Sequence, residues 1–305
     1  MRIISSRKGM RGHIAILEDE ADGSLVYMED DIFQSHSSPT GKSEFVYVQM
    51  MESFLGRANN VLVLGCGGGN LATMLSALGK TVTVVDHNPI SFELAHQYFG
   101  MPEHIACVVA DFREFLLAET RCFDGIAIDV GGPGFCFQDQ FDQSTCRSIK
   151  DRVASSGRVI MNIIIQNDFD PVADKIANAL SDDQMGAWIF DQPGQMKRNA
   201  LIACLPRRRL SSDSCFIAEI DNSADMTGAV RRPRRAKANG RTRVIDIRST
   251  APSGECVEIS SGTAVSVSSV AEQCLSQIPL MESAREFRDT TTVSSSVSGS
   301  PKCRV

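Results

Sequence analysis

Three aspartates hold the positions in this sequence that are best suited to chemistry. Asp86, Asp111 and Asp129 each follow directly after a short apolar run. Runs of this length and composition are typical of buried strands. The carboxyl ends of parallel strands share one edge of an open α/β sheet, and ligands bind at that edge. We therefore expect three carboxylates around one cleft, where they could accept hydrogen bonds from a ligand or take a proton from it.

A glycine-rich loop comes before the first of these acids. The apolar run Val61–Leu64 leads into the loop at residues 65–69, and the helical segment Leu71–Leu78 follows it. Glycines allow the backbone to turn sharply and to approach a ligand closely. This is the order of a nucleotide-type site: a strand, a glycine loop, a helix, a second strand and an acid. The acid, here Asp86, can accept hydrogen bonds from both ribose hydroxyls. A tight turn that binds nothing is the structural alternative.

The spacing of the glycines narrows the kind of nucleotide. Dinucleotide sites have G-x-G-x-x-G, whereas Gly65, Gly67 and Gly69 alternate. A pyrophosphate also needs the open helix N-terminus that the longer spacing supplies. The L-G-C-G-x-G form is similar to the first motif of S-adenosylmethionine-dependent enzymes with the methyltransferase fold. That similarity implies a cofactor with a ribose and no phosphate.

The elements that must position these residues alternate between strand and helix. Residues 57–206 predict a Rossmann-like, doubly wound and mostly parallel α/β sheet, closed by an antiparallel pair within residues 188–204. Residues 1–56 form a small N-terminal region in which residues 13–28 predict a β-hairpin. Residues 207–305 lose the periodicity and are basic and Ser-rich, so we expect a largely flexible tail.

Composition and charge limit the class of protein. The hydrophobic fraction of 43% is typical of a globular protein, and no apolar run approaches the length of a membrane span. The ten cysteines include no C-x-x-C pair, so we expect reduced thiols, no zinc site and a cytoplasmic location. Residues 1–205 carry 16 Lys and Arg against 26 Asp and Glu, an excess of acid that disfavours nucleic acid as a partner.

The segments around the aspartates resemble the spermidine synthase (polyamine aminopropyltransferase) family over roughly residues 12–205. Val84–Pro89 resembles the family's V-E-I-D-P, Val109–Leu116 resembles V-G-D-G-R-E-F-L, and Phe123–Asp129 resembles Y-D-V-I-I-V-D. The resemblance implies the methyltransferase-type fold and a cofactor that is S-adenosylmethionine or its decarboxylated form. It also implies transfer of an aminopropyl group to an amine acceptor without a metal. The sequence leaves a homodimer open.

The resemblance and the layout together assign the site residues. Asp129 is expected to be the catalytic base, or else a strand-end carboxylate in a solvated loop. Asp111 binds the adenine amino group or caps the helix that starts at Phe112, and these two roles can coexist. Gln34 begins a predicted loop that runs to Ser43, and we expect Gln34 to close over the cofactor from the hairpin side. The full set of expected cofactor-binding residues is Gln34, Gly65, Gly67, Gly69, Asp86, His87, Asp111 and Phe112.

Three departures from the family concern the amine rather than the nucleoside. Gly68 stands where synthases have the aspartate of G-G-G-D-G, and Gly132 stands where they have the second aspartate of D-x-x-D-P. The run Tyr47–Met50 replaces Y-H-E-M, and we expect Tyr47 to belong to the core. Buried ammonium groups need carboxylate partners, and these departures remove two of them. Two other functions therefore stay open. These are methyl transfer from the same pocket and nucleoside binding without turnover.

Overall fold

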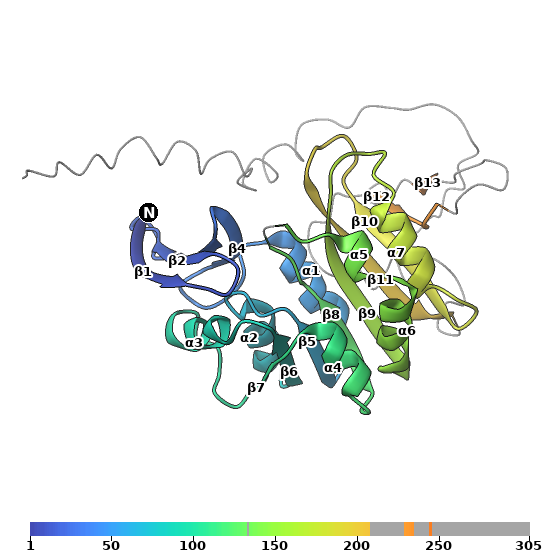
Figure 1. The fold of residues 1–305 in the computed structure, drawn as a ribbon, viewed down its shortest axis with the longest axis horizontal. Helices are drawn as coiled ribbons and strands as arrows, with labels where there is room; N and C mark the ends of the chain where they lie inside the picture. The colour runs from blue at the N-terminus through green and yellow to red at the C-terminus, as the bar shows by residue number, and fades with distance from the viewer. Residues whose placement is uncertain (133, 208–228, 235–243, 246–305) are drawn as a thin grey trace, which may run out of the picture. The chain divides into compact units, whose positions relative to one another are not determined.

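The computed structural model describes residues 1–132, 134–207, 229–234 and 244–245. Two β-sheets organise these residues, one of four strands and one of nine. Figure 1 shows the small sheet at the N-terminal end of the chain and the large sheet with helices against it. In the part of the chain that is described, no helix has the length and apolar character needed to span a membrane.

The small sheet is antiparallel, with its strands in sequence order. The predicted hairpin is confirmed as β2 (His13–Glu18) and β3 (Leu25–Glu29). It is flanked by β1 (Arg2–Lys8) and β4 (Ile32–Ser37), which the sequence pattern did not predict. The loop expected to begin at Gln34 therefore begins later. Pairing with β3 makes this polar segment a strand, because strand formation depends more on cross-strand partners than on intrinsic preference.

The large sheet has the predicted mostly parallel centre and antiparallel closing pair. Its strand order is β13-β12-β10-β11-β9-β8-β5-β6-β7. The pairs among the five strands from β9 to β7 are parallel, and β11 pairs antiparallel with β9 and with β10. The strands are β5 (Asn60–Leu64), β6 (Thr81–Asp86), β7 (Ala106–Val109), β8 (Phe123–Ile128), β9 (Val153–Ile165), β10 (Met185–Asp191) and β11 (Arg198–Pro206).

Helices cover both faces of this sheet because successive strand residues point to opposite sides. On β5, Val61 and Val63 pack in one cluster with helices α1 to α3, and Leu62 and Leu64 pack in another with α4, α6 and α7. The helices are α1 (Val46–Leu55), α2 (Asn70–Ala77), α3 (Pro89–Tyr98), α4 (Phe112–Ala118), α5 (Phe137–Gln140), α6 (Gln143–Asp151) and α7 (Val172–Leu180).

Two short strands come from the segment that was expected to be a flexible tail. β12 (Ala229–Arg231) pairs antiparallel with β10, and β13 (Val244–Ile245) pairs with β12. The other residues after Arg207, apart from 232–234, lie outside the described residues. The predicted boundary at residue 206 stays a prediction, but the large sheet continues beyond it.

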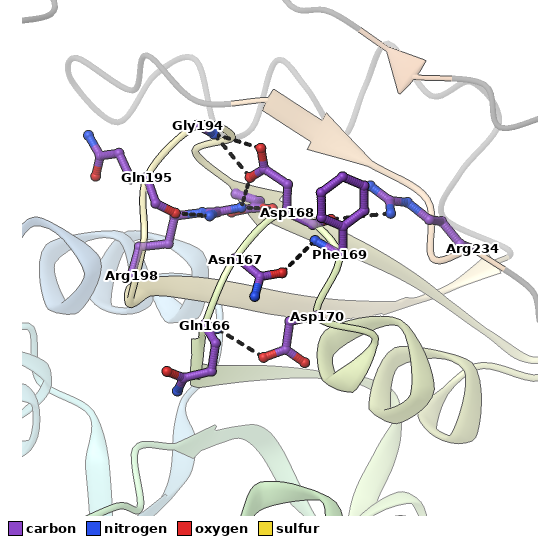
Figure 2. Close-up of polar contacts among 10 residues, drawn as sticks. Gln166, Asn167, Asp168, Phe169, Asp170, Gly194, Gln195, Arg198 and Arg234 are labelled. Atoms are coloured by element: carbon purple, nitrogen blue, oxygen red, sulfur yellow. Dashed lines mark hydrogen bonds and ion pairs between the residues drawn. The ribbon is translucent and has the colours of Figure 1, made fainter.

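An ion-pair cluster around the buried Arg198 joins two loops at the carboxyl end of β9. Arg198 donates to both carboxylate oxygens of Asp191, at 2.6 and 3.0 Å, and its Nη2 lies 2.8 Å from Oδ1 of Asp168. The Asp168 carboxylate also accepts from the backbone N–H of Gly194. Figure 2 shows these contacts between the segment after β9 and the β10–β11 connection. The cluster therefore fixes the sheet edge next to the strand ends that carry the predicted site.

Candidate functional site

A cavity lies where the glycine loop meets the small sheet. Backbone and side chains from β4, the glycine loop, the first turn of α2 and the end of β8 line it. Among the predicted site residues, the cavity wall includes Gln34, Gly65, Gly69 and Asp129. The assignment of these residues to a ligand stays a prediction, but they do surround one space.

The glycine loop has a conformation and a packing that side chains would disturb. Gly65, Gly67 and Gly69 all have positive φ angles, of 96°, 52° and 73°. A Cβ atom on Gly65 would lie 2.2 Å from the carbonyl oxygen of Asp129. This close approach brings the loop directly against the end of β8, so the loop and Asp129 form one continuous wall.

Asp86 is fixed at the end of β6 by the loop it faces. Its Oδ2 accepts from the N–H of Cys66 at 2.8 Å, and its Oδ1 accepts from the N–H of Asn88 at 2.8 Å. The cap of α3 is Asn88 and not Asp86, because the side chain of Asn88 accepts from Ile90 N. His87 is partly exposed, with Nδ1 3.4 Å from Asp86 Oδ1. A carboxylate oxygen can accept more than one hydrogen bond, so Asp86 retains capacity for ligand hydroxyls.

Asp111 and Phe112 have structural roles, and neither lines the cavity. Asp111 caps α4, since its Oδ1 accepts from the backbone N–H groups of Arg113 and Glu114 and from Arg113 Nε. Burial raises the pKa of Asp111, but these bonds outweigh burial and leave the pKa below its usual value. Phe112 is buried and stacks on Phe141 with ring centroids 5.3 Å apart. The capping alternative for Asp111 is therefore present, and its role at adenine stays a prediction.

Asp129 is held by two side chains from distant parts of the sequence. Asn162 Nδ2 donates to its Oδ1 at 3.0 Å, and the Tyr47 hydroxyl donates to its Oδ2 at 3.4 Å. Burial raises the pKa of Asp129, while the two hydrogen bonds oppose that rise without cancelling it. The carboxylate therefore has a fixed orientation at the cavity wall and a higher proton affinity than an exposed aspartate.

Sequence reasoning underestimated Tyr47 and missed Asn162. Tyr47 does pack against the core and stacks on Phe45, as expected, but its hydroxyl reaches Asp129. Burial and the neighbouring carboxylate raise the pKa of Tyr47, so it stays a donor. Asn162 is a buried amide within the otherwise apolar run from Val159 to Ile165 of β9. That single polar residue in an apolar strand is the signal that could have identified it.

Ser35 of β4 connects the small sheet to the glycine loop. Its hydroxyl oxygen accepts from the N–H of Gly68 at 2.9 Å. A Cβ on Gly68 would lie 3.0 Å from the Phe99 ring and 3.1 Å from Ser35 Cβ. A side chain at position 68 would therefore require Phe99 or Ser35 to shift by a few tenths of an ångström. At position 132, by contrast, the nearest atom to an added Cβ is Glu29 Oε2, 3.8 Å away.

Comparison with known proteins identifies the fold. Residues 61–156 match a family model described as a methyltransferase domain. A probable spermidine synthase from Corynebacterium glutamicum is similar in structure, with a TM-score of 0.65 at 17% identity over 76% of this chain and 92% of that one. Spermidine synthase from Thermotoga maritima has a TM-score of 0.52 at 17% identity, over 68% and 73% of the two chains.

A spermidine synthase in complex with the transition state analogue AdoDATO is also similar. Its TM-score is 0.53 at 16% identity, over 68% of this chain and 74% of that one. No curated protein sequence matches significantly. At these identities the structural likeness establishes the fold alone. The chain contains an S-adenosylmethionine-dependent methyltransferase-fold domain, preceded by a four-stranded antiparallel sheet.

Proposed function

We propose that this protein is a transferase that binds an S-adenosyl ligand at the glycine loop and uses Asp129 as a base. The observation that carries this proposal is the Asp129 carboxylate at the cavity wall, oriented by Tyr47 and Asn162. The ligand's sulfonium supplies the activated carbon, so the remaining task for the protein is to position a nucleophile and accept its proton.

The residues around the cavity fit an S-adenosyl ligand. Asp86 does not line the cavity but contacts the lining residue Cys66, and it has spare acceptor capacity for the ribose hydroxyls. Asn70 also lines the cavity, and its buried amide oxygen has no hydrogen-bond partner among the described residues. Gln34 would contact the ligand from β4. His87, Asp111 and Phe112 would lie on the adenine side, as the family resemblance implies.

The proposed step requires a nucleophile with a free lone pair. An ammonium group has none, so the acceptor must be neutral or must lose a proton before it attacks. Asp129 accepts that proton, and its raised pKa brings it closer to the basicity that this task requires. The fixed carboxylate also holds the nucleophile at one position, so that positioning contributes to the rate.

Two forms of this transfer share the same base and nucleoside site. In the spermidine synthase-like form, an amine attacks the carbon beside the sulfonium of the decarboxylated ligand and methylthioadenosine leaves. The likeness to spermidine synthase structures supports this form. In the second form, a methyl group is transferred from intact S-adenosylmethionine. The glycines at positions 68 and 132, which remove two family carboxylates, favour the second form.

Product identity distinguishes the two forms. The purified protein is incubated with each ligand and a panel of nucleophiles, and the nucleoside products are separated. Methylthioadenosine indicates transfer of the aminopropyl group, and S-adenosylhomocysteine indicates transfer of the methyl group. If neither product forms although the nucleoside binds, the protein is a binding protein without turnover and the proposal for Asp129 is wrong.

Asp86→Ala is expected to weaken methylthioadenosine binding by about 10- to 100-fold. The substitution removes hydrogen bonds between a carboxylate and the ribose hydroxyls, and charge-assisted bonds are among the stronger ones. Calorimetry measures the affinity. Asp142→Ala is the matched control, because that carboxylate caps α6 through Thr145 N instead. Equal affinities for Asp86→Ala and the unchanged protein would contradict the ribose assignment.

Putrescine is expected to be a poor acceptor. Its two ammonium groups would need carboxylate partners. At two positions where the family has aspartates, this chain has Gly68 and Gly132. An unpaired buried charge costs several kcal/mol, which lowers affinity by orders of magnitude. The assay follows aminopropyl transfer to putrescine, cadaverine and spermidine at saturating decarboxylated ligand. Putrescine turnover at about 1 per second or faster, a rate typical of enzymes, would restore the full synthase function.

A further inference from the structure

Asn162 of β9 holds the Asp129 carboxylate with one end of its amide, while the other end of the amide has no partner. Only 7% of the residue is exposed. Its Nδ2 donates to Oδ1 of Asp129 at 3.0 Å. Its Oδ1 is buried and accepts no hydrogen bond from any residue that the structure describes. A buried amide that is bonded at one end still carries the desolvation penalty of the other end.

The position of Asn162 in the sheet does not call for a polar side chain. Its neighbours along β9, Met161 and Ile163, are buried apolar residues, and its partner in β11 is the buried Leu201. A leucine at position 162 would be close to asparagine in size and would leave no polar atom unsatisfied. The contact with Asp129 is therefore the feature of the structure that explains the amide.

Asp129 needs different partners before and after it takes a proton. A carboxylate only accepts hydrogen bonds, whereas a carboxylic acid also donates one. Besides burial, the described groups that shift the pKa of Asp129 are Asn162 and Tyr47, which lies on α1. Burial and the carboxylate raise the pKa of Tyr47, so its hydroxyl remains a donor to Oδ2. Asn162 is the partner that combines a donor with a carbonyl oxygen.

We infer that Asn162 is a positioning residue whose amide turns over when Asp129 takes the proton of the nucleophile. The inference rests on the proposed function. The nucleophile forms a bond to the transferred carbon, the electron pair of the carbon–sulfur bond goes to sulfur, and the proton goes to Oδ1 of Asp129. A half-turn of the amide, whose terminal torsion is broad in asparagine, then lets the carbonyl oxygen of Asn162 accept that proton. Both states have one bond between the two side chains, so the turn loses no hydrogen bond.

Nuclear magnetic resonance of the free protein tests the turn without any ligand. Asparagine carries ¹⁵N and ¹³C labels, and the Asn162 signals are assigned by their absence from Asn162→Leu. As the pH falls through the pKa of Asp129, the bonded amide proton should lose its downfield shift and the Asn162 Cγ should gain one. Neither signal should titrate in Asp129→Asn. A change at the amide proton alone would show an amide that keeps its orientation, and would overturn the inference.

The pH profile of group transfer gives a second test. Asn162→Leu removes a partner of both states, so the apparent pKa of the reaction should rise by less than about one. Loss of a donor to the carboxylate alone would raise it by about one to two, the value of a hydrogen bond to a charged group. A rise in that higher range would overturn the inference. The transfer rate of Asn162→Leu should fall about tenfold.

Asn199→Leu is the matched control. Asn199 makes the same chemical change available on the neighbouring strand β11, two residues from the partner of Asn162, and it has no bond to Asp129. Its rate and pH profile should stay as in the unchanged protein. Equal losses in the two variants would trace the effect to packing of the sheet and overturn the inference. If no nucleoside product forms with any ligand, the proposed function fails, and the amide signals still decide whether Asn162 turns over.

Discussion

Asp129→Asn is expected to reduce the rate of group transfer by about 10²- to 10⁴-fold, the usual contribution of a general base. The substitution preserves the shape of the side chain and one oxygen, so the contact with Asn162 Nδ2 can persist. It removes the ability to take a proton from the nucleophile. Single-turnover measurements give the rate, and calorimetry with methylthioadenosine should show that nucleoside binding is retained.

The matched control for this substitution is Asp124→Asn at the opposite end of β8. Asp124 accepts from the N–H groups of Asn59 and Asn60 and is far along the strand from the cavity. Its variant should keep the transfer rate. The unchanged protein should also lose activity as the pH falls through the pKa of Asp129, which burial raises above that of an ordinary aspartate. A rate that Asp129→Asn leaves unchanged would mean that Asp129 is not the base.

Arg198→Met is expected to lower the free energy of unfolding by about 3–5 kcal/mol, the typical effect of removing one partner of a buried ion pair. The Arg198 and Asp191 side chains are each 5% exposed. Without the guanidinium, the Asp191 carboxylate stays buried with no cation, and Asp168 loses a partner at the surface. Urea unfolding measures the change.

Two further variants show whether burial of the ion pair causes the loss of stability expected for Arg198→Met. Arg7→Met removes the exposed pair with Glu93, where N and O lie 3.5 Å apart, and should change stability by less than about 1 kcal/mol. The double variant Arg198→Met, Asp191→Leu removes both buried charges and should recover much of the loss, since apolar replacement of a whole pair is often neutral. A double variant as unstable as the single one would show that packing, and not the unpaired charge, sets the effect.

The backbone of the site could be predicted from the sequence because local chemistry determines it. Gly65, Gly67 and Gly69 adopt positive φ angles that most residues avoid, so their spacing specifies the loop. Asp86 and Asp129 could be placed at strand ends because apolar runs stop before them. These signals lie within a few residues of the features they specify.

The residues that surround Asp129 could not be predicted, because they come together only in the folded chain. Tyr47 and Asn162 lie 82 and 33 residues from Asp129 in the sequence. The apolar run around Asn162 marks it as an unusual polar residue, but nothing near Asn162 or Tyr47 indicates that a carboxylate will be its partner. The strand β4 was missed for a related reason, since the residues of Gln34 to Ser37 are polar and become a strand through pairing with β3. The tight packing around position 68 likewise depends on Ser35 and Phe99.

The hydrogen bond between Ser35 and Gly68 links ligand binding to the opening of the junction between the two sheets. Two separately paired sheets meet at the cavity, and polar contacts cross between them, including Asn70 with Gly41 and Tyr27 with Ser91 at 3.1 Å. A molecule bound there would touch both sides of this junction and would add to the contacts that hold it closed. Ligand binding and the stability of the N-terminal sheet are then thermodynamically linked. The amide hydrogen of Gly68 would exchange with solvent at a rate that reports the opening of the junction.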